Sequence, residues 1–118
     1  MTRLYSGSDG QTHAENIEVK LMPARTVAGV DGSESFNVSG AQFVRVRQGS
    51  VQDWHTAPRR QYVVALNGRM EVELGGGDTL QFNPGQMVLA EDLTGKGHIT
   101  RSIGSEDLAL LFVPLQAQ

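Results

Sequence analysis

Hydrophobic and polar residues alternate along much of this chain with a period of two. The clearest example is Met70, Val72 and Leu74, which are separated by glutamates. Such alternation is typical of a β-strand with one buried and one exposed face. By the same criteria we expect further strands at residues 17–21, 25–30, 41–46, 51–55, 61–66, 79–82, 87–90, 98–103 and 108–115. No segment shows a sustained helical period, so the pattern predicts an all-β chain.

Short turns rich in glycine, asparagine and aspartate separate the predicted strands. Asn67-Gly68 is a dipeptide that favours two-residue hairpin turns, and Asn83-Pro84-Gly85 is a second turn signal. Roughly nine to eleven short strands in so short a chain predict a single domain built as a sandwich or closed barrel. Residues 1–16 are polar, so we expect them to form a loose N-terminal arm, with the barrel domain spanning residues 17–118.

Composition excludes several classes of function. The chain has 118 residues, a formal net charge of -3 and no basic run, so a nucleic-acid partner is not expected. It contains no cysteine, which excludes disulfides and thiolate chemistry. The longest apolar run, residues 108–113, is too short to span a membrane, and the N-terminus lacks an apolar signal region. We therefore expect a cytoplasmic protein that acts on small molecules.

Polar chemistry is concentrated in residues 49–68. This segment contains His55, Arg59, Arg60 and Gln61 directly beside a strand rich in β-branched residues. Polar groups next to a core destabilise the fold unless a partner satisfies them. We therefore expect the functional site to lie here.

The spacing of this segment resembles the first motif of the cupin superfamily. Gly49, His55, Gln61 and Gly68 fall at motif positions. Two positions depart from the motif: Ala57 stands where a second histidine is usual, and Gln61 stands where a glutamate is usual. The resemblance implies a small antiparallel jelly-roll barrel as a single domain.

A second stretch resembles the second cupin motif. Gly85 begins it, Glu91 occupies its proline position, and after a longer loop His98 and Ser102 fall at its histidine and asparagine positions. The segment from Trp54 to Arg60, taken with Glu91-Asp92 and His98, also looks like a group of small bacterial cupin-domain proteins. Cupins usually hold a divalent metal inside the barrel through three histidines and one glutamate, and they are often dimers.

The first hypothesis for the site is a metal centre formed by His55, Gln61 and His98. Two imidazoles and an amide oxygen suit Zn, Fe, Ni or Mn, although the ligand set has no negative charge. In the resemblance the strand carrying His55 faces into the barrel, and His98 enters from the facing sheet. In this hypothesis the protein binds one divalent metal ion; in the alternatives it binds none.

Two other hypotheses need no metal. In the first, His55 or His98 transfers a proton, Glu91 or Asp92 holds the tautomer, and Arg59 or Arg60 binds a carboxylate or a developing oxyanion. In the second, the pocket binds a ligand without turnover. The residues expected to contact an aromatic or carboxylated ligand are then Trp54, Tyr62, Glu91, Asp92, Arg59 and Arg60.

Together these features predict a small cupin-type enzyme that acts on a small polar or carboxylated molecule. The reaction classes considered are metal-assisted isomerisation or elimination and oxygenation, and the alternative is a non-catalytic small-molecule-binding cupin. A homodimer is also expected, because the predicted strand at residues 17–22 has a bare edge that could pair across a two-fold axis.

Overall fold

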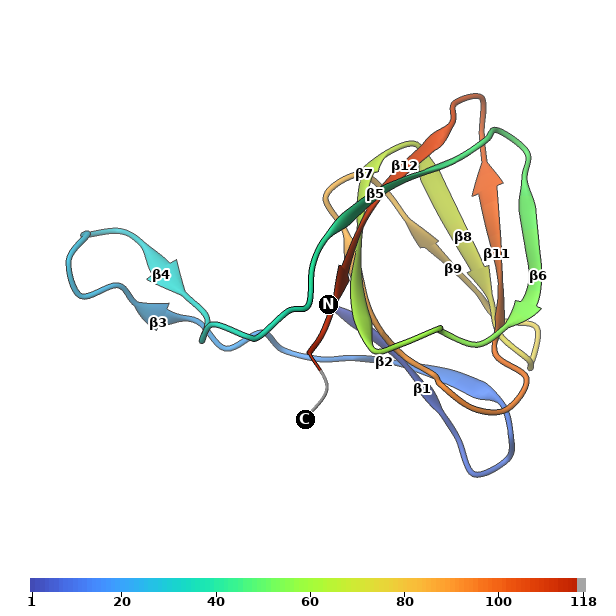
Figure 1. Ribbon diagram of the computed structural model, residues 1–118, viewed down its shortest axis with the longest axis horizontal. Helices are drawn as coiled ribbons and strands as arrows, with labels where there is room; N and C mark the ends of the chain where they lie inside the picture. Colours follow the sequence, from blue (N-terminus) through green and yellow to red (C-terminus); the bar gives the residue numbers. More distant parts are fainter. Residues whose placement is uncertain (117–118) are drawn as a thin grey trace.

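Two β-sheets packed face to face form a barrel in the computed structural model, which describes residues 1–116 (Figure 1). The six-stranded sheet has the order β2-β1-β10-β7-β12-β5 and the four-stranded sheet the order β6-β11-β8-β9. No helix occurs in this part of the chain, so the predicted all-β class is confirmed. The strand bounds are β1 Thr2–Ser6, β2 Thr12–Asn16, β3 Met22–Pro23, β4 Asp31–Gly32, β5 Gln42–Val46, β6 Val51–His55, β7 Gln61–Asn67, β8 Arg69–Glu73, β9 Thr79–Phe82, β10 Met87–Glu91, β11 His98–Ile103 and β12 Leu108–Pro114.

The N-terminal segment differs from the sequence prediction. Residues 1–16 are not a loose arm, because β1 and β2 form an antiparallel hairpin that joins the six-stranded sheet through parallel pairing of β1 with β10. Leu4 and Thr12 are both buried. The segment has a polar sequence because only a few of its side chains face the core.

The projecting segment lies instead between β2 and β5. Residues 17–41, which we call the arm, leave the barrel and return to it, and the short β3–β4 hairpin forms its tip (Figure 1). The strands predicted at residues 17–21 and 25–30 are therefore wrong. The first segment lies outside any strand, and the second forms the turn of the hairpin. Alternation predicts which face of a strand is buried, but a strand also needs an adjacent strand with which to form backbone hydrogen bonds.

The turn at Asn67-Gly68 connects the two sheets rather than closing a hairpin. Its flanking strands belong to different sheets, since β7 pairs with β10 and β12 whereas β8 pairs with β9 and β11. Gly68 has a φ of 76°, and a Cβ there would lie 2.6 Å from the carbonyl oxygen of Asp107. Packing against the residues before β12 thus requires glycine at this crossing.

Alternating side chains of both sheets fill the space between them. The most deeply buried apolar residues are Leu4, Ala65, Val72 and Leu108, contributed by four strands. A cavity remains between the two sheets, and Leu4 and Val72 form part of its wall. No helix in residues 1–116 is long and apolar enough to cross a membrane.

We expect Leu108→Ala to lower the free energy of unfolding by about 2–5 kcal/mol, because it leaves a cavity in a packed core. Leu108 is 0% exposed, whereas Leu66, on the neighbouring strand, is 45% exposed. The control Leu66→Ala is expected to change stability by no more than about 0.5 kcal/mol. Urea denaturation of both variants measures the difference, and equal effects would contradict this assignment of the core.

Candidate functional site

A cavity of about 260 Å³ lies between the two sheets. Most of its lining is apolar, with Val44, Val63, Val72 and Phe112 among the contributing residues. Five polar residues complete the lining: Gln52, His55, Gln61, His98 and Thr100. An apolar cavity with a few converging polar groups is the usual form of a small-molecule site.

His55 and His98 lie next to each other at this cavity. They are directly opposed on the antiparallel strands β6 and β11, and their ring centroids are 4.5 Å apart with an interplanar angle of 60°. The expectation that His98 enters from the facing sheet is wrong, because both histidines belong to the four-stranded sheet. Of the three predicted metal ligands, Gln61, on β7, is the one that lines the cavity from the opposite sheet.

Hydrogen bonds determine the tautomer of both histidines. Nδ1 of His55 lies 2.7 Å from the carbonyl oxygen of Asp53, which can only accept, so this nitrogen carries a proton. Nδ1 of His98 lies 2.5 Å from Oδ2 of Asp92, and its proton points to that carboxylate. In the neutral state each ring therefore has its lone pair on Nε2.

Asp92 is fully buried behind His98. Its Oδ2 also accepts a hydrogen bond of 2.8 Å from the hydroxyl of Thr12, and its carbonyl oxygen accepts one from the amide of Ala57. Its Oδ1 is buried and has no partner among residues 1–116. A buried carboxylate needs such donors, so Asp92 orients His98 rather than contacting a ligand.

Several residues predicted to contact a ligand lie outside the cavity. Arg59 is exposed, and Trp54 lies under the ammonium group of Lys96, 3.9 Å from its ring centroid. Tyr62 packs on Phe36, with ring centroids 4.8 Å apart. None of these lines the cavity, so their predicted roles there are not supported.

Arg60 and Glu91 form an ion-pair network on the outer side of the barrel. Nε of Arg60 is 2.6 Å from Glu91, and Nε of Arg3 is 2.8 Å from it; Arg3 also pairs with Glu15 at 2.7 Å. Burial acts to raise the pKa of Glu91, but the hydrogen bonds from the two arginines outweigh it and lower this pKa below its usual value. Arg60 and Glu91 therefore tie β1 to β10 and the segment before β7, and do not reach the cavity.

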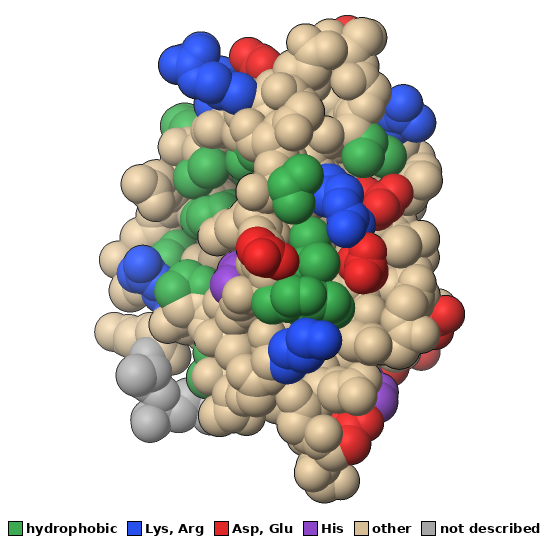
Figure 2. Space-filling model, turned by 90° about the vertical axis from the view of Figure 1, so that its right-hand side faces the viewer, with side chains coloured by type: hydrophobic (Ala, Val, Ile, Leu, Met, Phe, Trp, Pro, Cys, Tyr) green, Lys and Arg blue, Asp and Glu red, His purple; other side chains and the backbone are tan. Residues whose placement is uncertain are grey.

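Charged side chains of both signs are interspersed on the face that Figure 2 shows. Arg101, on β11, pairs with Glu71 at 3.2 Å and with Glu73 at 2.9 Å, and both glutamates are on β8.

The donor set at the cavity fits a weakly held divalent transition metal. Metal-binding histidines usually donate their second ring N–H to a carboxylate or carbonyl, and His55 and His98 both do so. Gln61 is buried and adds a neutral amide oxygen. The described residues contain no cluster of three or more His, Asp or Glu that could hold a metal. No aspartate or glutamate of residues 1–116 lines the cavity, so such an ion would have no anionic protein ligand there, which lowers the expected affinity.

Sequence analysis missed three residues of this site. Thr12 holds Asp92 from 80 positions away, and Gln52 and Thr100 line the cavity beside the histidines. No local signal distinguishes Thr12 from an ordinary polar residue. Alternation along β11 from His98 could have placed Thr100 on the inward face, but the register shift between β6 and β11 breaks the alternation between His55 and Gln52.

No family model and no curated protein matches this chain. Solved structures do. A Cupin 2 conserved barrel domain protein from Salinispora arenicola is 20% identical, with a TM-score of 0.54 over 86% of this chain and 82% of that one. A cupin domain from Bordetella pertussis is 15% identical, with a TM-score of 0.52 over 87% of this chain and 100% of that one. At these identities the likeness shows the fold alone, and the resemblance to cupins is confirmed at that level.

We expect Gly97→Ala to disturb the histidine pair. Gly97 has a φ of 79°, and a Cβ there would overlap the backbone carbonyl of His55. Gly77→Ala is the matched control, because Gly77 has a φ of 95° but open space around it. The control should lose about 1 kcal/mol of stability from the left-handed backbone. Gly97→Ala should lose about 2 kcal/mol more from the clash, and equal losses in thermal unfolding would contradict this close approach.

Glu91→Gln should destabilise the protein at pH 7 by about 1 kcal/mol, because it removes the charge that Arg3 and Arg60 share. A carboxylate whose folded-state pKa is lowered stabilises the fold above its unfolded-state pKa, here near 4.5. That contribution is lost as the pH falls through the lower, folded-state value. Denaturation from pH 7 to pH 3 should therefore show the two proteins converging, while the exposed control Glu106→Gln tracks the wild type throughout.

Proposed function

We propose that this chain, which has the cupin fold, binds a small, mostly apolar molecule beside a divalent transition metal ion. One observation carries the proposal: two imidazoles face the same cavity, and the Nδ1 atom of each is already occupied by a hydrogen bond. Their Nε2 lone pairs can therefore bind an electrophile. Histidines held in this way usually bind a divalent metal ion.

The residues that would hold the ion are His55 and His98 through Nε2 and Gln61 through its amide oxygen. This set is neutral, so water or the ligand would fill the remaining positions. When bound, the ion supplies Lewis-acid activation of a coordinated oxygen. Gln61 supports this role because it is buried and reaches the cavity from the sheet opposite the histidines.

The cavity walls favour a ligand that is small and mostly apolar. Val44, Val63 and Phe112 exclude water from one part of the cavity, and Gln52 and Thr100 offer hydrogen bonds near the histidines. No lysine or arginine of residues 1–116 lines this cavity. Without the metal a carboxylate would have no protein cation to pair with, so the carboxylated ligand expected from sequence would have to bind through the metal ion.

A second candidate is metal-independent proton transfer by His98. It is favoured by the fully buried Asp92, whose carboxylate would stabilise the imidazolium formed when Nε2 of His98 accepts a proton. In this case Asp92 keeps the proton on Nδ1 and leaves Nε2 to face the ligand. The two candidates use the same ring but differ in their response to chelation.

Substitution of the histidines tests the metal site. Ni²⁺ or Zn²⁺ binding, measured by calorimetric titration and by elemental analysis after dialysis, should weaken by more than about tenfold in His55→Ala and in His98→Ala. Loss of even an orienting residue has an effect of that size. Asp92→Asn should weaken binding by about 10–100-fold.

His13→Ala is the matched control, because His13 is the remaining histidine and pairs with Asp9 away from the cavity. It should bind metal as the wild type does. Wild-type affinity in both cavity variants would refute the metal site. Ligand binding or turnover that survives chelation but fails in His98→Ala would favour the second candidate.

A further inference from the structure

An irregularity in β6 places two of its side chains on the same wall of the cavity. His55 pairs with His98 and Gln52 pairs with Thr100, so two residues of β6 lie opposite a single residue of β11. Such a two-against-one pairing is a β-bulge. In a regular strand, residues three positions apart point to opposite faces, whereas Gln52 and His55 both line the cavity. The bulge therefore adds Gln52 to the wall that carries the histidines.

Two polar pairs consequently follow each other along this wall. The first pair is His55 with His98, and the second is Gln52 with Thr100. His98 and Thr100 are two positions apart on β11, which sets the spacing between the two pairs at about 7 Å. Directly opposed side chains on neighbouring strands are close enough to contact the same group. Gln52 and Thr100 therefore form a second polar subsite beside the histidine pair.

This second subsite has hydrogen-bonding groups but no charge. The amide of Gln52 and the hydroxyl of Thr100 can each donate and accept a hydrogen bond. No lysine, arginine, aspartate or glutamate of residues 1–116 lines the cavity. Gln52 is exposed whereas His98 is buried, so the second pair lies on the open side of the cavity. The complement of this subsite is a neutral ligand group such as a hydroxyl, a carbonyl or an amide.

We propose that Gln52 and Thr100 select ligands that carry a second, neutral polar group. This inference rests on the proposed function, in which an oxygen of the ligand binds the metal ion held by the histidine pair. The spacing of the two pairs requires about four carbon atoms between the metal-binding group and the second polar group. The apolar walls, Val44 and Phe112 among them, accommodate that spacer. The substrate class is thus a short aliphatic chain or a small ring with a polar function at each end.

Matched pairs of ligands test the subsite. On the Ni²⁺-loaded protein the probes are pentanohydroxamic acid and its 5-hydroxy derivative, which share a metal-binding head and differ in one terminal hydroxyl. The preference for the hydroxylated probe, measured by calorimetric titration, should fall by about threefold to tenfold in Gln52→Leu and in Thr100→Val, the effect of one neutral hydrogen bond. Gln81→Leu and Thr79→Val are the matched controls, because both residues are exposed on β9 and do not line the cavity. They should keep the wild-type preference.

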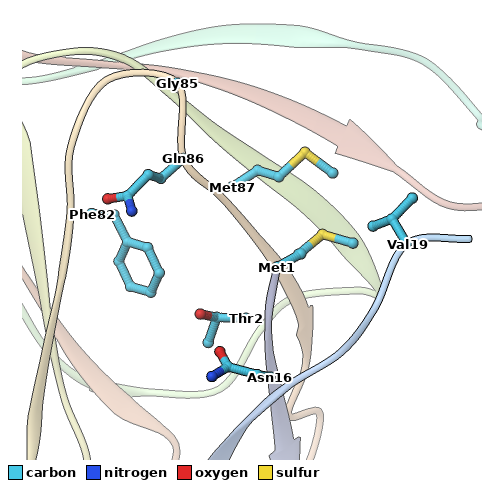
Figure 3. A pocket seen from close by; sticks show the side chains of 8 residues that line it. All are labelled: Met1, Thr2, Asn16, Val19, Phe82, Gly85, Gln86 and Met87. Atoms are coloured by element: carbon cyan, nitrogen blue, oxygen red, sulfur yellow. The ribbon is translucent and has the colours of Figure 1, made fainter. Parts of the chain in front are cut away.

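A second hollow defines the competing outcome. Figure 3 shows this hollow, which has a volume of about 420 Å³ and is lined by Met1, Val19, Phe82 and Met87 among others. An alkyl probe bound there would contact neither Gln52 nor the histidines, so its preference would be the same in every variant. An equal preference in the wild type and in both cavity variants would therefore overturn the proposal.

Failure of the proposed function has a different signature. Gln52→Leu and Thr100→Val should bind Ni²⁺ as the wild type does, because neither residue is a ligand in the proposed metal site. A wild type that binds no Ni²⁺ refutes the metal site, and the subsite is then tested on the metal-free protein by NMR titration with 1-pentanol and 1,5-pentanediol. There the Nε2 atoms of the histidines accept the first hydroxyl. A preference for the diol that is lost in the two cavity variants supports the subsite, whereas an unchanged preference or no binding of either alcohol overturns it.

Discussion

The hydrogen bond between Asp92 and His98 is the interaction on which the site depends. Asp92 is 0% exposed, and a buried carboxylate is tolerated only where donors converge on it. Those donors come from His98 at the start of β11 and from Thr12 on β2, while the amide of Ala57 holds the backbone. This one carboxylate thereby holds together the N-terminal hairpin, the loop after β10 and the start of β11.

The same interaction determines what His98 can do. With its Nδ1 proton directed to Asp92, the ring presents Nε2 to the cavity, as His55 does through its bond to Asp53. The other polar residues of the lining are Gln52, Gln61 and Thr100, and the remaining walls are mostly apolar. The cavity therefore combines a small polar end with a mostly apolar body, which suits a small, mostly apolar ligand.

Residues 17–21 of the arm have the alternation of a strand but form no strand in this chain, and the reason is physical. Apolar and polar residues alternate there as in a strand, yet within this chain the segment has no neighbouring strand and its apolar side chains lie on the surface. Side-chain burial and backbone pairing normally reinforce each other. Residues 17–21 show that a sequence can encode the alternation without the neighbouring strand that would complete it.

Local pattern in the sequence was enough to predict the all-β class, most strand positions and the candidate residues His55, Gln61 and His98, because alternation and motif spacing are properties of neighbouring residues. Only the tertiary structure decided that both histidines share one sheet, that Arg59 and Arg60 lie outside the cavity, and that Asp92 meets Thr12. Alternation states which side of a strand is buried, but not which strand lies beside it. The partner of a buried polar group is likewise a long-range property, since Thr12 and Asp92 are 80 positions apart and only folding brings them together.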